Sequence, residues 1–173
     1  MTPIEKAVKA LQDQLRDGVQ AVDTFRNETT VVLGRDVIVA ACRILRDDPA
    51  LRFDLLAALT AVDYHPQEPR FAVVYQLYSI AQNVFLGLRV YLPGQSPEVA
   101  TIESVYPNAN WHEREVFDMF GINFLGHSDL RRILMPHDWV GHPLRKDYPL
   151  AYEEVQYSFN FDEIDKRKPY AKD

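Results

Sequence analysis

The sequence has one cysteine and seven glycines among 173 residues, and both shortages exclude whole classes of protein. A lone thiol, Cys42, can form no internal disulfide and cannot supply the set of thiolates that holds an iron–sulfur cluster. The glycines form neither the G-x-G-x-x-G pattern of dinucleotide-binding proteins nor the G-K-[ST] pattern of phosphate loops. We therefore expect a chain without a cluster of its own, in which Cys42 is a small buried side chain.

Long apolar runs and an excess of positive charge are also missing. The longest apolar runs, such as residues 37–42, are far shorter than the ~20 residues that cross a membrane. The net charge of −6 argues against a protein that binds nucleic acid by neutralising phosphates. Residues 1–17 mix acidic and basic side chains without an apolar block, so we expect no signal or transit peptide. These absences indicate a soluble, intracellular protein.

The patterns that are present predict alternating helices and strands. Thr2 and Glu5 have the spacing of a capping box, Pro3 suits the first helical position, and apolar residues then recur at helical spacing. The expected elements after this helix are a hairpin of strands at 19–25 and 29–33, a helix at 37–46, a helical turn at 51–56 followed by a strand that ends at Asp63, strands at 71–79 and 84–92, and helices at 97–105 and 111–120.

Strands that follow one another through short turns favour antiparallel pairing, with helices packed on the sheet. The sequence thus predicts an α+β fold, a two-layer sandwich of a mostly antiparallel or mixed sheet with helices. The order is α-β-β-α-β-β-β-α, where the last α stands for two helical segments. We expect residues 1–124 to form this domain and residues 125–173 to form an extended C-terminal segment that docks on partner subunits.

Residues 111–150 combine charged and aromatic side chains more densely than any other part of the chain. His112, Glu115 and Asp118 recur every three residues and could share one helical face, as metal ligands do. A carboxylate-bridged helical metal site draws its ligands from several helices, however, and no matching Glu-x-x-His occurs elsewhere in the sequence. A charged face that pairs with nearby arginines is the simpler interpretation, and a free-standing metal-dependent enzyme stays as an alternative.

The histidines that follow do not form a recognisable zinc or catalytic motif. His127, His137 and His142 are spaced by ten and by five residues, unlike the close pairs of structural zinc sites, and no cysteines accompany them. Ser128 and Asp129 are next to His127 in sequence, but nothing around the serine resembles a nucleophile elbow. Arginines lie among tryptophans, phenylalanines and tyrosines in the same stretch, which is the composition enriched at protein–protein interfaces.

This stretch also resembles a known family. The residues that match its signature are Glu113-Arg114-Glu115, Asp118-Met119-Phe120, His127, Arg131 and Ile133-Leu134, with Met135-Pro136, Gly141-His142-Pro143-Leu144-Arg145-Lys146-Asp147-Tyr148-Pro149 and, upstream, Val62-Asp63-Tyr64 and Val74-Tyr75-Gln76-Leu77-Tyr78-Ser79. The similarity is to the thirty-kilodalton subunit of proton-pumping NADH:quinone oxidoreductase, respiratory complex I. It covers roughly residues 52–150.

The resemblance implies a cofactor-free structural subunit in the peripheral, quinone-module arm of that complex. It further implies that the chain packs on a large forty-nine-kilodalton subunit and a cluster-bearing neighbour. FMN, iron–sulfur clusters and quinone would belong to these and other partner subunits, which pass electrons from NADH to quinone while protons are translocated. The implied location is the cytoplasmic side of the bacterial inner membrane, reached only through the complex. Ferredoxin-dependent plastoquinone-reducing complexes and membrane-bound hydrogenases share the signature and remain alternatives.

We accordingly expect no catalytic, cofactor-binding or metal-binding residue in this chain, and an interface with other subunits in its C-terminal part. The expected interface residues are Glu113, Arg114, Glu115, Asp118, His127, Arg131, Arg132, Trp139, His142, Arg145, Lys146, Asp147 and Tyr148. Six of them are hypothesised to form one charged network that fixes the last helix to the extended segment: Glu113, Arg114, Glu115, Asp118, Arg131 and Arg132.

Overall fold

The computed structural model describes residues 1–149, and the expected segment beyond them lies outside the described residues. Its centre is a five-stranded sheet in the order β1-β2-β5-β4-β3. The pairs are antiparallel except for β2 and β5, which run parallel. The strands are β1 (Val19–Phe25), β2 (Glu28–Leu33), β3 (Leu55–Asp63), β4 (Phe71–Ser79) and β5 (Val84–Leu92). The predicted α+β class with a mixed, mostly antiparallel sheet is confirmed.

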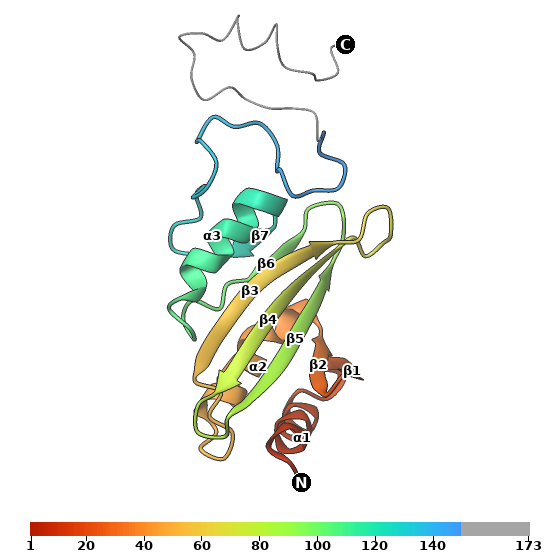
Figure 1. Ribbon diagram of the computed structural model, residues 1–173, viewed down its shortest axis with the longest axis vertical. Helices are drawn as coiled ribbons and strands as arrows, with labels where there is room; N and C mark the ends of the chain where they lie inside the picture. The colour runs from red at the N-terminus through yellow and green to blue at the C-terminus, as the bar shows by residue number, and fades with distance from the viewer. Residues whose placement is uncertain (150–173) are drawn as a thin grey trace, which may run out of the picture.

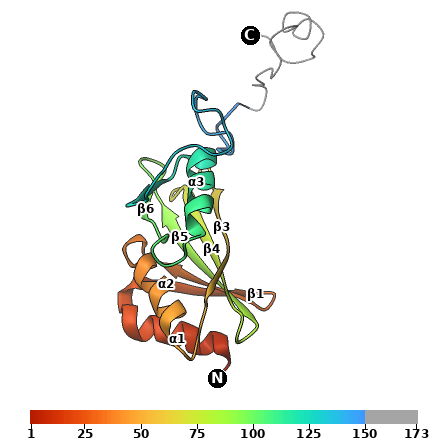
Figure 2. The ribbon, with the colours of Figure 1, turned by 90° about the vertical axis from the view of Figure 1, so that its left-hand side faces the viewer.

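Helices cover one face of this sheet, as Figures 1 and 2 show. The helices are α1 (Pro3–Leu15), α2 (Ile38–Asp47) and α3 (Ala109–Phe120), with short 3-10 turns η1 (Arg16–Gly18) and η2 (Arg35–Val37). Alternate residues of β4, Phe71, Val73, Tyr75 and Leu77, are fully buried against them. This alternation is the period-two pattern of a strand with one covered face. α3 packs beside β3, towards the end of the sheet opposite α1 (Figure 1).

The N-terminal helix is present with its predicted cap. The Thr2 hydroxyl accepts a hydrogen bond from the Glu5 amide at 3.1 Å, and the Glu5 carboxylate accepts one from the Thr2 amide at 2.9 Å. These reciprocal bonds satisfy two amides that the first turn of a helix leaves open. Cys42, on α2, is fully buried as expected.

The helix predicted at 97–105 is wrong. Ser96 has a φ of 49°, far from the extended conformation of an N-cap residue. The next residues form a short strand, β6 (Glu98–Ala100), which pairs in parallel with β7 (Asn123–Leu125). This pairing sets Val99 opposite Phe124, and both side chains are buried. Pairing with a strand more than twenty residues later therefore overrides the local helical pattern.

The helical turn predicted at 51–56 is also misplaced. The turn lies earlier, where the amides of Leu51 and Arg52 both donate to the Asp48 carbonyl at 3.0 Å. Leu55 and Leu56 already belong to β3 and pair with β4. Burial of Leu51 and Phe53 in the core fixes the chain between the turn and the strand.

After β7 the chain runs as an irregular segment past the C-terminal end of α3 (Figure 1). We call residues 126–149 the anchored segment; it contains no helix or strand. In the part of the chain that the structure describes, no helix combines the length and apolar character required to cross a membrane.

Candidate functional site

The anchored segment closes the C-terminal end of α3. The last four carbonyls of a helix have no partner within the helix and need one from elsewhere. Here each has one: Gly121 N–H donates to the Phe117 carbonyl at 2.8 Å, His142 Nδ1 to Asp118 at 2.9 Å, Leu144 N–H to Met119 at 3.1 Å, and Arg145 Nε to Phe120 at 2.6 Å. Three of the four donors belong to the anchored segment. A cationic side chain at this position also complements the negative end of the helix dipole.

Gly121 makes this closure possible. Its φ of 72° is the left-handed conformation that only glycine adopts without strain. A Cβ at this position would lie 2.5 Å from Nε2 of His142 and 2.6 Å from Nη2 of Arg145. The glycine therefore ends α3 and also leaves room for the two side chains that bind its carbonyls.

Asp118 binds the anchored segment from the side of α3. Its fully buried carboxylate accepts hydrogen bonds through Oδ2 from three successive amides, those of Ile133 at 3.0 Å, Leu134 at 2.8 Å and Met135 at 2.9 Å. Oδ1 receives Nη1 of Arg132 at 2.6 Å. Burial acts to raise the pKa of Asp118, but these amides and the guanidinium outweigh it and hold the pKa below its usual range. The carboxylate therefore stays charged and fixes residues 132–135.

Arg132 extends the contacts between α3 and the anchored segment. Its Nη2 donates to the carbonyls of Trp139 at 3.0 Å and Gly141 at 2.9 Å. One guanidinium therefore joins Asp118 of α3 to a later part of the anchored segment. Arg114, which is buried on α3, acts in a similar way on the Arg131 carbonyl, to which its Nε donates at 3.1 Å. Arginine suits this task because its planar group presents several donors in a fixed arrangement.

The predicted single network of charges is only partly correct. Asp118 and Arg132 form an ion pair, as the hypothesis requires. Arg114 pairs with backbone carbonyls instead of a carboxylate, and Arg131 is exposed, where its Nε lies 2.9 Å from Asp129. The Glu115 side chain is exposed and makes no hydrogen bond or ion pair within residues 1–149. The anchoring is thus done largely by backbone groups, which sequence spacing does not reveal.

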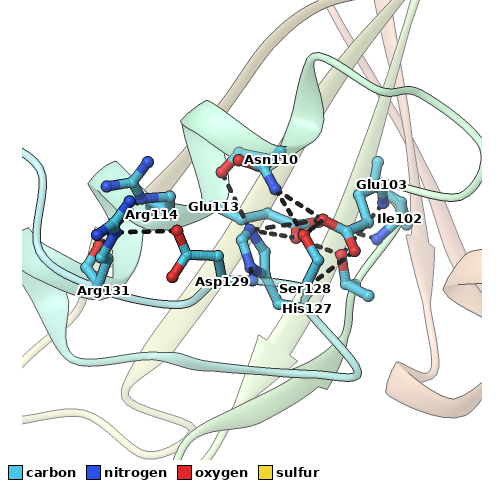
Figure 3. A network of polar contacts seen from close by, with 10 residues as sticks. Ile102, Glu103, Asn110, Glu113, Arg114, His127, Ser128, Asp129 and Arg131 are labelled. Atoms are coloured by element: carbon cyan, nitrogen blue, oxygen red, sulfur yellow. Dashed lines mark hydrogen bonds and ion pairs between the residues drawn. The ribbon is translucent and has the colours of Figure 1, made fainter.

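A second cluster, shown in Figure 3, joins α3 to the start of the anchored segment. Glu113 is fully buried, and its carboxylate accepts hydrogen bonds from the Ile102 amide at 2.9 Å and from the Thr101 hydroxyl. His127 Nε2 lies 3.1 Å from the Asn110 carbonyl and 3.9 Å from Oε2 of Glu113. Burial raises the pKa of Glu113 to about 7, against the opposing effect of the two donors.

Glu103 completes this cluster from the loop between β6 and α3. It accepts hydrogen bonds from the Ser128 amide at 2.9 Å and the Ser128 hydroxyl at 3.1 Å. The Asn110 side-chain amide also donates to Glu103, at 2.8 Å. Burial acts to raise the pKa of Glu103, and these donors lower it further than burial raises it. Residues 127–129 are therefore held between α3 and this loop.

A third attachment was not identified from the sequence. Arg70, at the start of β4, donates to both oxygens of Asp63 at 2.9 and 2.8 Å and to both oxygens of Asp147 at 2.9 and 2.6 Å. The backbone amide of Lys146 also donates to Asp63, at 2.9 Å. Such bidentate pairs are strong and directional. The far end of the anchored segment is thereby fixed to the edge of the main sheet.

Several hydrophobic side chains of the anchored segment face away from these contacts. Leu134, Val140 and Leu144 are 62%, 85% and 54% exposed. Trp111, on α3, is also exposed and lies under the guanidinium of Arg114, 5.2 Å from its ring centre. Tyr148 is half-buried, packs against Gly141 and donates its hydroxyl to the Val140 carbonyl at 3.3 Å. The anchored segment thus exposes three large aliphatic side chains, while Leu130 and Met135 pack against the core.

The positions of the candidate ligands Asp118 and Glu115 do not support the metal-binding alternative. Both oxygens of Asp118 are used by amides and a guanidinium, and Glu115 points to solvent. Within residues 1–149 there is no group of three or more histidine, cysteine, aspartate or glutamate side chains placed to hold a metal ion.

Comparison with known proteins identifies the family of this chain. Residues 31–154 match the family described as the 30 Kd subunit of respiratory-chain NADH dehydrogenase. The chain belongs to this family. The matched range contains the end of β2, all of α2, β3 to β7 and α3, and the anchored segment with all three attachments.

Individual relatives of the 30 Kd subunit family agree with this assignment. The chain is 48% identical to the C subunit of NADH-quinone oxidoreductase from Roseiflexus sp. (strain RS-1), over 96% of this chain and 95% of that one. A solved trypsin-resistant fragment (1-134) of Nqo5 is 30% identical, with a TM-score of 0.63, over 75% of this chain and all of the fragment. A chain of an archaeal membrane-bound sulfane sulfur reductase is similar in fold, at 21% identity and a TM-score of 0.66, over 98% of this chain and 95% of its own.

Proposed function

We propose that this chain is a structural subunit of an NADH-quinone oxidoreductase, that it holds no cofactor of its own, and that the anchored segment is its docking surface for the large forty-nine-kilodalton-type subunit. The family membership and the relatives named as NADH-quinone oxidoreductase subunits support the first part. The docking role rests on the arrangement of residues 126–149. Residues 150–173 belong to the same proposed docking region and lie outside the described residues.

One observation supports the docking role above all: the two sides of the anchored segment differ. Several of its backbone amides, together with Arg132 and Asp147, are bound to α3, to the loop after β6 and to Arg70, whereas Leu134, Val140 and Leu144 are exposed. The anchored segment has no core of its own, and exposing three large aliphatic side chains within about ten residues does not stabilise its fold. Large apolar side chains exposed among polar ones are typical of surfaces that another protein covers.

In the assembled enzyme, electrons would pass from NADH through FMN and iron–sulfur clusters to quinone, coupled to proton translocation. All of these groups would be bound by partner subunits, including cluster-bearing neighbours of the large subunit. The chain would be peripheral, on the cytoplasmic side of the bacterial inner membrane, and reach the membrane only through the complex. The names of its relatives favour NADH as donor over the alternatives, a ferredoxin-dependent plastoquinone-reducing complex or a membrane-bound hydrogenase.

The test replaces Val140 by aspartate in the intact complex. Because Val140 is 85% exposed, the folded protein tolerates the change, but a charge buried without a partner at an interface costs several kcal/mol. We expect the amount of assembled complex in membranes to fall tenfold or more, with the NADH:quinone turnover of each remaining complex unchanged. Ile80→Asp is the matched control, because Ile80 is 64% exposed and follows β4 at the opposite end of the sheet.

Normal assembly of the Val140→Asp variant would refute the docking role. Normal assembly with lost turnover would instead indicate a reaction site near this segment. Identification of the proteins that copurify with the tagged wild-type chain separates the NADH-dependent complex from the ferredoxin and hydrogenase alternatives.

A further inference from the structure

Glu113 is a buried carboxylate without a cationic partner. Its two oxygens face the Ile102 amide and the Thr101 hydroxyl, which are both neutral. The adjacent arginine on α3, Arg114, points away from this cluster (Figure 3). Arg114 donates to the carbonyls of Arg131 and Arg132. A charged carboxylate in such a place is costly, because neutral donors replace only part of its lost hydration.

His127 is the one nearby group that could become positive, and its hydrogen bonds oppose this. Its Nδ1 lies 3.0 Å from the Asp129 amide, which can only donate, so Nδ1 is an acceptor. Its Nε2 lies 3.1 Å from the Asn110 carbonyl, which can only accept, so Nε2 bears the proton. The imidazole is therefore neutral in this geometry. A proton on Nδ1 would break the contact that shapes the Ser128–Asp129 turn.

The other groups around Glu113 do not supply a positive charge either. Glu103, from the loop after β6, lies on the same imidazole, with Oε2 3.8 Å from His127 Nε2. Cys42 of α2 and Tyr75 of β4 are core groups that Glu113 affects electrostatically; both are fully buried, and burial raises the pKa of each. Two carboxylates thus flank one neutral ring, and any proton that enters this cluster is best placed on Glu113.

We propose that Glu113 is the proton-binding group of a latch at the start of the anchored segment, which holds residues 127–129 firmly when its carboxyl is protonated and loosens them when it is charged. The proposal rests on the docking role of the anchored segment, because the latch would regulate how well that segment is preordered. Charging Glu113 places a second negative charge beside Glu103, and Glu103 is the group that binds Ser128.

The direction of the pH effect follows from the raised pKa. An ordinary glutamate has a pKa near 4.3, and that of Glu113 in the closed cluster is about 7. The closed form therefore binds the proton more tightly than the open form, so closure is strongest at low pH. The closing equilibrium weakens by up to about tenfold for each unit by which the pH rises between these two pKa values. The fall is about fivefold from pH 6 to pH 7, and the equilibrium levels off above about pH 7.5.

Amide hydrogen exchange of the full-length chain tests this. The reporters are the amides of Ser128 and Asp129, which donate to Glu103 and His127. After correction for the intrinsic rate, their protection should fall about fivefold from pH 6 to pH 7 and stay nearly constant from pH 7.5 to 8.5. In Glu113→Gln the protection should stay at the level of the low-pH wild type throughout. Glu115→Gln, an exposed change on the same helix, should keep the wild-type pH dependence.

Protection that does not change with pH in the wild type would overturn the latch, as would an unchanged pH dependence in Glu113→Gln. If that variant fails to fold, the 13C carboxyl shift of Glu113 in the wild type decides, since a midpoint near pH 7 supports the latch and one below pH 5 overturns it. The isolated chain contains no partner, so this result is independent of docking. A titrating latch with normal assembly of Val140→Asp would refute the proposed function alone.

Discussion

Asp118→Asn is the most direct test of how the anchored segment is held. The substitution keeps the shape of the side chain and removes its charge. In the native protein one oxygen serves three amides and the other serves Arg132. An asparagine that keeps its oxygen on the amides turns its NH2 group towards Nη1 of Arg132, and two donors then lie where the ion pair measured 2.6 Å. The guanidinium of Arg132, whose side chain is 17% exposed, is left without its counter-charge.

The size of the effect can be estimated from the contacts. Removing one partner of a buried ion pair typically costs ~3–5 kcal/mol. Arg132 keeps its bonds to the carbonyls of Trp139 and Gly141, so the lower end of this range applies. We expect the free energy that closes the segment on α3 to fall by about 3 kcal/mol, which is roughly a hundredfold in the open population. The five-stranded sheet does not depend on this pair, so the loss should be local.

Trypsin cleavage measures the open population directly. The anchored segment contains four cleavage sites, after Arg131, Arg132, Arg145 and Lys146. When opening and closing are faster than cleavage, the cleavage rate follows the fraction of open molecules. Mass spectrometry of the fragments should show cleavage at these sites about a hundredfold faster in Asp118→Asn.

Glu115→Gln on the same helix is the control and should leave the rate unchanged, because its side chain is exposed. A cleavage rate in Asp118→Asn within twofold of the wild type would refute the reasoning. It would mean that the carboxylate contributes no net free energy to the attachment, and that the contacts with the α3 carbonyls hold the segment without it.

Two further substitutions probe the other attachments. Gly121→Ala should lower the melting temperature by roughly 5 °C in calorimetry, because a left-handed alanine costs about 1–2 kcal/mol and its Cβ displaces the side chains that bind the α3 carbonyls; an unchanged melting temperature would contradict this. Arg70→Lys should cost about 2 kcal/mol at the far end of the segment, because an ammonium cannot bind two carboxylates bidentately. Tryptic cleavage after Lys146 should then accelerate roughly thirtyfold while cleavage after Arg131 does not; equal acceleration at both sites would argue against separate anchors.

Elements that depend on adjacent residues could be predicted from the sequence. The capping box of Thr2 and Glu5 sets the start of α1 through groups three residues apart. The alternation of β4 shows which side chains face the core, because the period of a strand is two. In both cases the signal spans only a few adjacent residues, so the sequence pattern is sufficient to predict the feature.

The misassigned helix at 97–105 shows where such reasoning ends. Ser96 and Pro97 have the order of an N-cap and a first helical residue, which is a sound local signal. The strand that forms instead is selected by the pairing of Val99 with Phe124 and by burial of Ile102. These contacts join positions more than twenty residues apart, and their free energy exceeds the small helical preference of the segment.

The attachments of the anchored segment were harder to predict for a chemical reason. Arg132 and Asp118 are side chains of opposite charge, so their pairing could be anticipated. The partners of His142 and Arg145 are backbone carbonyls at the end of α3, and any residue type has a carbonyl. Arg70 was missed because its second carboxylate, Asp147, lies 77 residues away. Only the positions of the unpaired carbonyls, which follow from where α3 ends, could have given a signal.

The number of attachments matters for assembly as well as for stability. Ordering one residue of irregular chain costs about 1–2 kcal/mol of conformational entropy, and the anchored segment has no helix or strand to offset it. The contacts at Asp118, at the Glu113 cluster and at Arg70 supply that offset within the chain itself. A partner that binds the exposed Leu134 and Val140 then meets a surface that is already ordered, so association loses less entropy. It follows from the proposed docking role that weakening an inward-facing anchor should reduce assembly through the loss of order in this segment.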